Sequence, residues 1–323
     1  MRAVVATAYG SPDVLRVDKV ARPTPDDDEV LVRVRATVVG PPDSAAREGS
    51  PFPIRFFSGL RRPNAVPGDV FAGDIEAVGR DVARFAPGDA VFGTAAPRSG
   101  AHAECLCLPE DGALTIMPSG LTYSDAAAVC DGGLTAMAFL TDHADIRAGD
   151  AVLVNGASGS VGTAAVQLAS EFGASVTGVC STANVDLVRS LGAETVLDYT
   201  RTDFTTTGTS YDVIFDAVGK RSYAECKDSL TPDGRYLTTV PSVGILLRTL
   251  WTRLVGGRQA RFAATGLASA RTKRAHLVAL RELVEAGTFR PVVDRSSPLD
   301  EIADAHRYVD TGHKTGSVVV TVA

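Results

Sequence analysis

The chain lacks the sequence features that mark membrane-spanning, secreted and nucleic-acid-binding proteins. No apolar run approaches the roughly 18 residues of a membrane-spanning helix, and the opening MRAVVATAYG predicts a short strand without the long apolar core of a signal peptide. The five cysteines are odd in number and scattered over 323 residues, so a reduced, cytoplasmic setting is expected. A net charge of −6 gives no reason to expect a nucleic-acid or membrane partner.

Recognisable metal-ligand and hydrolase patterns are also missing. The five histidines show no HExxH or other ligand spacing, and no second cysteine pair accompanies Cys105 and Cys107, which would share one face of a strand. We find no Ser/His/Asp set and no carboxylate pair at a glycosidase-like spacing. We therefore expect no metal site and interpret all five cysteines as structural thiols.

Acidic residues are absent between Asp233 and Glu282, although nine arginines and lysines fall inside this segment. In a chain of net negative charge this is a real local bias. A solvated basic face is the favoured interpretation, and electrostatic attraction of an anionic cofactor or substrate is the alternative.

Two kinds of pattern divide the chain. The first hundred or so residues predict short strands, such as Glu29–Val39, separated by turn signals. From about Thr122 helical and strand patterns alternate, which implies parallel pairing in a doubly wound sheet. The predicted strands are Ala151–Asn155, Ser175–Cys180, Thr195–Asp198, Asp212–Ala217, Arg235–Val240 and Arg261–Thr265.

A glycine-rich loop opens this alternating region. The sequence VLVNGASGSVGTAAVQLA places Gly156, Gly159 and Gly162 between a predicted strand and a predicted helix. Gly156 permits a tight turn, Gly159 lets the backbone approach a phosphate, and Gly162 lets helix and strand pack closely. The N–H groups at the helix start then face the anion. We predict a dinucleotide site formed by Gly156, Ser158, Gly159, Ser160, Val161 and Gly162.

The end of the second predicted strand favours NADPH over NADH. An acidic residue there would accept the ribose hydroxyls of NADH, but the sequence reads Val-Cys-Ser-Thr-Ala-Asn and has no acid. Ser181 and Asn184 are candidates for the 2′-phosphate, and Tyr199 and Arg201 could reach it from the next strand end. Ser181 and Asn184 could equally cap the following helix. Further cofactor candidates at or near later strand ends are Ala217, Val218, Val240 and Ala263.

In order and spacing, these motifs resemble the medium-chain dehydrogenase/reductases, and within them the zinc-free quinone oxidoreductase-like branch. The resemblance runs nearly end to end. It is carried by GPPD at 40–43, PGDVFAG at 67–73, GGLTA at 132–136, the glycine loop, DVIFDAVG at 212–219 and HKTG at 313–316. It implies a GroES-like β-domain made of residues 1–121 and 266–323, a Rossmann domain of residues 122–265, a cleft where substrate and nicotinamide meet, and commonly a homodimer.

The positions of the zinc ligands in zinc-dependent relatives lack those ligands here. The first falls in GPPD at 40–43 and the second reads Gly68-Asp69-Val70, while Cys130 lies near the third. One cysteine cannot form a site that needs three protein ligands. The chain also departs from the branch that it resembles, which usually has Asn in place of Gly40 and often a basic residue in place of Ala183.

Without a metal, hydride transfer to an already electrophilic acceptor is the expected chemistry, so quinones and α,β-unsaturated carbonyls are the predicted substrates. Thr135 resembles the family threonine beside the nicotinamide, or is a helix-interior residue. Asp131 could contact substrate or ribose, or be a helix-terminal charge. Asp43 could order the cleft loop, or be a turn residue.

Two apolar segments are candidates for the substrate pocket. The loop Pro51–Arg62 contains Phe57, and the segment Ile245–Val255 contains Trp251, the single tryptophan. Positions 247, 250, 251, 254 and 255 share one helical face, for which core packing is the commonest reason, with a dimer contact or pocket lid as alternatives.

Two alternative functions stay open from the sequence. One is an alcohol dehydrogenase or ketone reductase, and the other is a non-catalytic NADPH-binding protein such as a redox sensor or crystallin-like protein.

Overall fold

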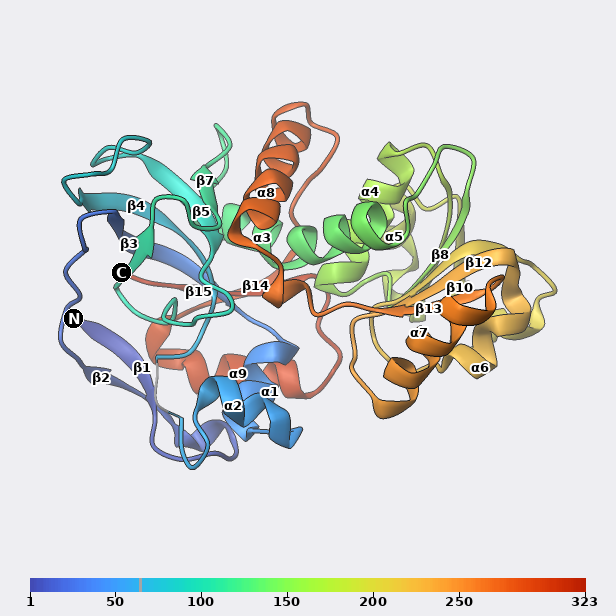
Figure 1. The fold of residues 1–323 in the computed structure, drawn as a ribbon, viewed down its shortest axis with the longest axis horizontal. Helices are drawn as coiled ribbons and strands as arrows, with labels where there is room; N and C mark the ends of the chain where they lie inside the picture. Colours follow the sequence, from blue (N-terminus) through green and yellow to red (C-terminus); the bar gives the residue numbers. More distant parts are fainter. Residues whose placement is uncertain (64–65) are drawn as a thin grey trace. The chain divides into compact units, whose positions relative to one another are not determined.

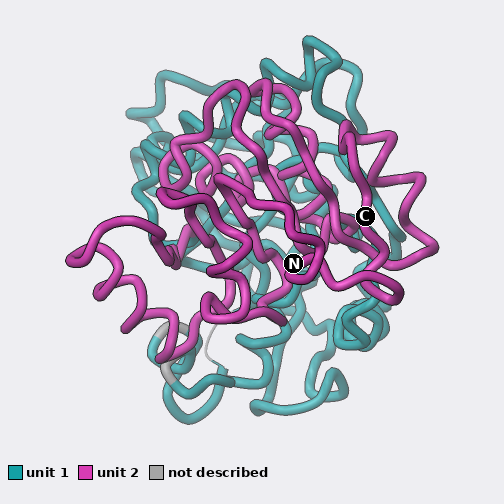
Figure 2. The backbone as a smooth tube through the Cα atoms, turned by 90° about the vertical axis from the view of Figure 1, so that its right-hand side faces the viewer, with its two compact units in different colours: residues 1–131, 266–323 teal, residues 132–265 magenta. Residues whose placement is uncertain are grey.

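A computed structural model describes residues 1–63 and 66–323, without the side chains of Pro53 and Phe57. Contacts divide these residues into two compact units, Met1–Asp131 with Gly266–Ala323, and Gly132–Thr265 (Figure 2). The first boundary lies within α3 (Tyr123–Ala138), later than the predicted boundary at residue 121, because α3 contributes residues to both units. No helix in the described part of the chain is long and apolar enough to cross a membrane.

The first unit is built on a sheet of seven strands around the long strand β3 (Glu29–Val39). Its order is β14-β15-β3-β4-β5-β7, and β6 also pairs with β3. The last strand, β15 (Ser317–Thr321), pairs antiparallel with β3, so the chain end returns to this unit. The other strands are β1 (Arg2–Ala6) and β2 (Leu15–Lys19), which form a separate pair, β4 (Val70–Val78), β5 (Ala90–Thr94), β6 (Cys105–Pro109), β7 (Leu114–Ile116) and β14 (Val293–Pro298).

Helices and apolar side chains complete this unit. Its core includes the fully buried Phe71, Val91 and Leu114, contributed by three neighbouring strands. The predicted pocket loop at 51–62 is partly helical. The helices are α1 (Pro41–Glu48), α2 (Arg55–Ser58), α8 (Ala270–Glu285) and α9 (Ile302–Asp310).

The second unit is a six-stranded parallel sheet of order β10-β9-β8-β11-β12-β13, which confirms the predicted doubly wound α/β fold. Helices α4 and α5 lie along one side of it and α6 and α7 along the other (Figure 1). The strands are β8 (Ala151–Asn155), β9 (Ser175–Cys180), β10 (Thr195–Asp198), β11 (Tyr211–Asp216), β12 (Leu230–Thr238) and β13 (Gln259–Phe262). The helices are α4 (Ser160–Glu171), α5 (Val185–Ser190), α6 (Tyr223–Cys226) and α7 (Val243–Val255).

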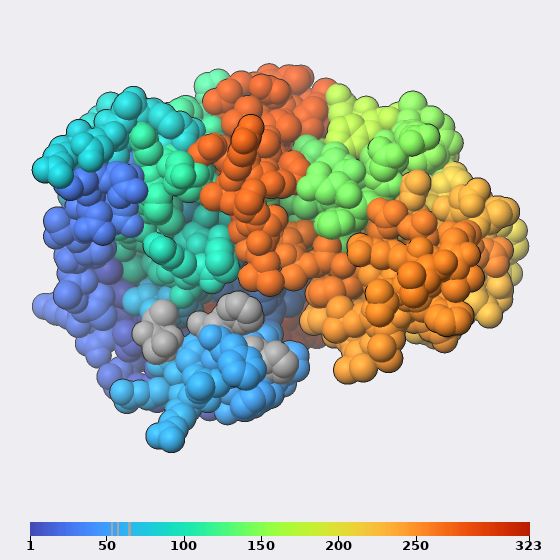
Figure 3. Space-filling model, in the orientation of Figure 1, coloured from blue at the N-terminus to red at the C-terminus, as the bar shows by residue number. Residues whose placement is uncertain are grey.

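One expectation about packing is wrong. The apolar face of α7 does not pack on the sheet: Leu247, Leu250, Trp251, Leu254 and Val255 are all more than half exposed. The inward face instead carries Ile245 and Thr252, whose hydroxyl accepts a hydrogen bond from the amide of Ala260 in β13. Space-filling atoms of this orange segment accordingly lie on the surface (Figure 3).

Candidate cofactor site

The three glycines of the loop after β8 have different structural roles. Gly156 has φ +80°, and a Cβ there would lie 2.1 Å from the Val218 side chain. A Cβ on Gly162 would lie 2.0 Å from the carbonyl oxygen of Gly156, so helix and loop pack without room for a methyl group. A Cβ on Gly159 would meet only that same oxygen, at 3.6 Å. Gly156 and Gly162 therefore shape the loop, whereas Gly159 leaves an open face.

The start of α4 has the chemistry of an anion site. Gly159 is the N-cap residue and has no side chain that could cap the helix, and the first N–H groups of a helix have no carbonyl partner within it. The helix dipole adds partial positive charge at the same place. An open glycine face at the N-terminus of a helix fits a pyrophosphate.

Thr135 lies on the part of α3 that packs against this helix start. A Cβ on Gly132, one turn earlier in α3, would lie 2.0 Å from the carbonyl oxygen of Ser160, so the two backbones touch. Thr135 is partly exposed on this segment. The structure therefore places Thr135 on the segment of α3 that adjoins the glycine loop, and its role beside the cofactor stays a prediction.

The residues predicted for the 2′-phosphate meet at the carboxyl ends of β9 and β10. The Asn184 amide donates to the Ser158 hydroxyl at 3.1 Å and to the Ser181 hydroxyl at 3.3 Å, which ties the glycine loop to the end of β9. The amide of Tyr199 donates to the carbonyl oxygen of Cys180, so the end of β10 lies alongside. The side chains of Tyr199 and Arg201 are mostly exposed there.

An acidic residue that the sequence analysis missed lies in this group. Asp198 is the last residue of β10 and pairs in register with Cys180 at the end of β9. Its carboxylate accepts a hydrogen bond from the Thr182 hydroxyl at 2.5 Å and lies 3.6 Å from the guanidinium of Arg201. Hydrogen bonds from the Thr182 and Thr200 hydroxyls lower the pKa of this carboxyl group. No acidic residue directly follows β9 in the sequence, but the fold places Asp198 of the neighbouring strand beside the end of β9.

A second missed residue, Asp216, organises the end of β11. Its fully buried carboxylate accepts hydrogen bonds from five donors: the Asn155 amide, the backbone N–H groups of Val218, Gly219 and Arg221, and the Tyr236 hydroxyl. A run of apolar strand residues ending in an acid before a glycine, Ile-Phe-Asp-Ala-Val-Gly, was the available signal. Asp216 thereby fixes the loop that carries the candidates Ala217 and Val218.

The remaining strand-end candidates border the same edge of the sheet. The amide of Ala217 donates to the carbonyl oxygen of Asn155, immediately before the glycine loop. The Val240 side chain, after β12, lies 2.4 Å from where a Cβ on Gly219 would be. Ala263 directly follows β13. All three lie beyond the carboxyl ends of parallel strands, where ligands of such sheets bind.

Trp251 lies apart from the cofactor candidates at the carboxyl ends of the strands. It lines a surface hollow of about 570 Å³ with residues that include Pro232, near the start of β12, and Arg258, just before β13. The hollow therefore lies at the amino ends of the strands, because α7 runs back along the sheet from the carboxyl edge. The side chain of Phe57, the other apolar substrate candidate, lies outside the described residues.

In the first unit, the predicted residues Asp43 and Asp131 form an acidic cluster with Asp69. The Gly40 amide donates to Asp43 at 2.8 Å and the Ser317 hydroxyl donates to Asp131 at 2.8 Å. Burial, opposed by the Gly40 hydrogen bond and reinforced by the charge of Asp131, raises the pKa of Asp43 to about 7. Burial, with Asp43 and Asp131, likewise raises the pKa of Asp69 to about 7.

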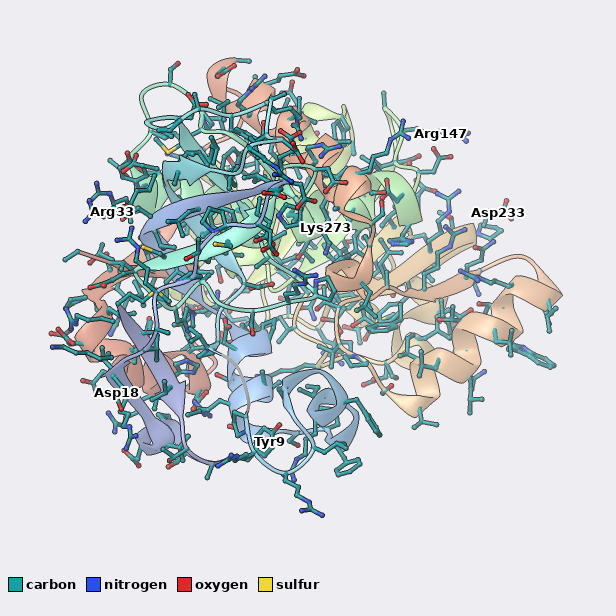
Figure 4. The ribbon with its side chains drawn as sticks, turned by 60° about the vertical axis from the view of Figure 1, so that its left-hand side comes forward. Tyr9, Asp18, Arg33, Arg147, Asp233 and Lys273 are labelled. Atoms are coloured by element: carbon teal, nitrogen blue, oxygen red, sulfur yellow. The ribbon has the colours of Figure 1, made fainter. Side chains whose placement is uncertain are left out.

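A buried lysine lies close to this cluster. The ammonium of Lys273 on α8 (labelled in Figure 4) donates to the carbonyl oxygens of Ala96 and Gly266 at 2.7 and 2.5 Å. Burial lowers the pKa of Lys273, while Asp69 and then Cys130 act in the opposite direction. Among the described residues, no group of three or more His, Cys, Asp or Glu side chains could hold a metal ion.

The parallel sheet, the open glycine loop and the strand-end residues have the arrangement of a dinucleotide-binding domain. Residues 26–146 match the family described as "Alcohol dehydrogenase GroES-like domain", and residues 191–320 match "Zinc-binding dehydrogenase". The chain is 32% identical to the 2-methylene-furan-3-one reductase of Solanum lycopersicum, over 99% of this chain and 79% of that protein. It is 31% identical to the chloroplastic NADPH-dependent alkenal/one oxidoreductase of Arabidopsis thaliana, over 99% and 79%.

Solved structures of similar fold include a quinone oxidoreductase. The quinone oxidoreductase of Coxiella burnetii has a TM-score of 0.89 and 27% identity, with 100% of this chain and 99% of that chain covered. The chain belongs to the medium-chain dehydrogenase/reductase superfamily, in its quinone oxidoreductase-like branch. This is a family of oxidoreductases that use a pyridine nucleotide, so the predicted family and enzyme class are confirmed.

Proposed function

We propose that this protein is an NADPH-dependent, metal-free oxidoreductase that reduces quinones or α,β-unsaturated carbonyls. The observation that carries the proposal is the open face of Gly159, the N-cap residue of α4, in a chain whose relatives include an alkenal/one oxidoreductase and a quinone oxidoreductase. Bound NADPH would supply a hydride. Such acceptors are already electrophilic, so no metal is needed to polarise them.

The protein's own contribution is binding and orientation. The backbone of Gly159 and the first turn of α4 would hold the pyrophosphate, and Ser181, Asn184 and Arg201 the 2′-phosphate. Thr135 and the strand-end residues would border the rest of the cofactor. Asp43, Asp131 and Phe57 stay predictions for the substrate side, and a cytoplasmic location stays a prediction from cysteine usage.

NADPH oxidation is expected with a panel of quinones and enones, at rates that EDTA does not change. Absorbance at 340 nm measures the turnover, and oxidation of simple alcohols with NADP⁺ serves as the comparison. Tight NADPH binding without turnover of any acceptor would instead indicate a non-catalytic cofactor-binding protein. Activity lost in EDTA and restored by zinc would indicate an alcohol dehydrogenase or ketone reductase.

We further propose a homodimer in which α7 contributes to the interface. Seven apolar side chains on this helix are each more than half exposed, and an exposed apolar face of this kind is typical of a protein–protein interface. The helix packs against β13, the edge strand of the sheet, so a second copy could cover both. The seven residues are Val243, Leu246, Leu247, Leu250, Trp251, Leu254 and Val255.

The variant Leu250→Glu is expected to sediment as a monomer, whereas the wild-type protein sediments at twice the chain mass. A charge in the middle of the apolar face would have to be desolvated on association. Leu267→Glu changes a similarly exposed leucine outside α7 and is expected to leave the dimer intact. A monomeric wild type, or a Leu250→Glu variant that remains dimeric, contradicts this assignment.

A further inference from the structure

The carboxylate of Asp198 accepts three hydrogen bonds and faces one guanidinium group. One oxygen accepts from the Thr200 amide at 2.9 Å and the Thr200 hydroxyl at 2.7 Å. The other accepts from the Thr182 hydroxyl at 2.5 Å and faces the Arg201 guanidinium at 3.6 Å. A carboxylate has about four acceptor positions. Three of these positions are occupied and the fourth faces Arg201, so Asp198 acts on a nucleotide there mainly through its charge and through Thr182.

The position of this charge matters for cofactor choice. Thr182 lies between Ser181 and Asn184, the residues proposed to contact the 2′-phosphate, and Asp198 holds its side chain. A phosphate next to a carboxylate is repelled, whereas the adenosine ribose of NADH carries no such charge. The Asp198 side chain is 12% exposed, and the guanidinium of Arg201 at 3.6 Å offsets part of its charge.

Arg201 carries the opposing charge. Its side chain is 76% exposed, and its ion pair with Asp198 is long, so the guanidinium can turn toward a phosphate at small cost. Arginine binds phosphate through several directed N–H groups. The two residues thus act in opposite directions on the same ligand group, three positions apart in the sequence.

We propose that Asp198 and Arg201 together set the selectivity between NADPH and NADH. Asp198 orients Thr182 and lowers the affinity for a 2′-phosphate, whereas Arg201 raises the affinity for a 2′-phosphate. This rests on the proposed cofactor site. Asp198 is a positioning residue that acts through Thr182 and through space. Hydrogen bonds from the Thr182 and Thr200 hydroxyls lower its pKa, so the charge is present at neutral pH.

The test compares dissociation constants of NADPH and NADH, measured by calorimetry, for the wild-type protein and three variants. Asp198→Asn removes the charge but keeps an oxygen for the threonines, and is expected to tighten NADPH binding about tenfold while NADH changes less than twofold. Arg201→Ala is expected to weaken NADPH binding about tenfold and leave NADH unchanged. Asp186→Asn breaks the exposed Asp186–Arg189 pair on α5 and should change neither.

Repeating the binding measurements at several salt concentrations distinguishes an effect of the Asp198 charge from an effect of altered local structure. The gain in Asp198→Asn should shrink as ionic strength rises, because salt screens the repulsion that the wild-type carboxylate exerts. An unchanged ratio of the two constants, or an equal change for both cofactors, overturns the proposal. A wild-type protein that binds NADH as tightly as NADPH refutes the proposed NADPH preference instead, while the shift in the ratio still decides the role of Asp198. Binding of neither cofactor refutes both.

Discussion

Replacing Gly159 with valine is expected to weaken NADPH binding about 100-fold, or roughly 2.7 kcal/mol, while the unliganded protein keeps its melting temperature. Gly159 has φ −77° and ψ 173°, a conformation that valine readily adopts. A Cβ there meets only the carbonyl oxygen of Gly156, at 3.6 Å. The new side chain would instead occupy the open face where the backbone must approach the pyrophosphate.

Gly162→Ala is the contrasting variant. Its Cβ would lie 2.0 Å from the carbonyl oxygen of Gly156, so the loop or α4 must move. We expect a lower melting temperature without any cofactor present. Cofactor titration and thermal unfolding of both variants separate the two roles. Wild-type NADPH affinity in Gly159→Val would show that the nucleotide binds elsewhere.

Replacing Asp216 with alanine is expected to lower the free energy of unfolding by about 3–5 kcal/mol. The change leaves four donors at the end of β11 without this acceptor, and the Tyr236 hydroxyl with only the carbonyl oxygen of Arg221, around a position that is fully buried. Denaturant unfolding followed by circular dichroism measures the loss. NADPH binding should weaken as well, because the loop carrying Ala217 and Val218 loses its anchor.

Asp212→Ala is the matched control for this prediction. Asp212, near the start of the same strand, accepts hydrogen bonds from the Ala151 amide and the Thr231 hydroxyl, both at 2.9 Å. With fewer donors and partial exposure, its loss should cost about 1–2 kcal/mol. Equal losses for the two variants would mean that the network around Asp216 adds nothing beyond an ordinary hydrogen-bonded aspartate.

The sequence predicted the framework of the second unit well. The strands β8, β9 and β10 have the predicted bounds, because each is a short apolar run between turn signals. It was less accurate for β12, which begins at Leu230 although Pro232, Asp233 and Gly234 are typical of a turn. Leu230 pairs with Tyr211 across a register shift, a tertiary contact that no local pattern indicates.

Only those parts of the candidate site that are contiguous in the sequence could be predicted. The glycine loop is one contiguous segment, so spacing alone identified it. The roles of Asp198 and Asp216 depend on donors from other elements, such as Thr182 and Asn155, and no sequence spacing links them. The absence of an acid from the end of β9 was read correctly, but the neighbouring strand brings Asp198 beside it.

Short-range patterns of apolar residues and glycines were enough to predict the fold class and the family, and they indicate the glycine loop as the proposed phosphate site. The open face of Gly159, the carboxylates beside the proposed site and the outward direction of the apolar face of α7 became visible only in the folded chain. Each of these depends on which neighbour strand pairing and helix packing bring to a residue. That neighbour comes from a distant part of the chain.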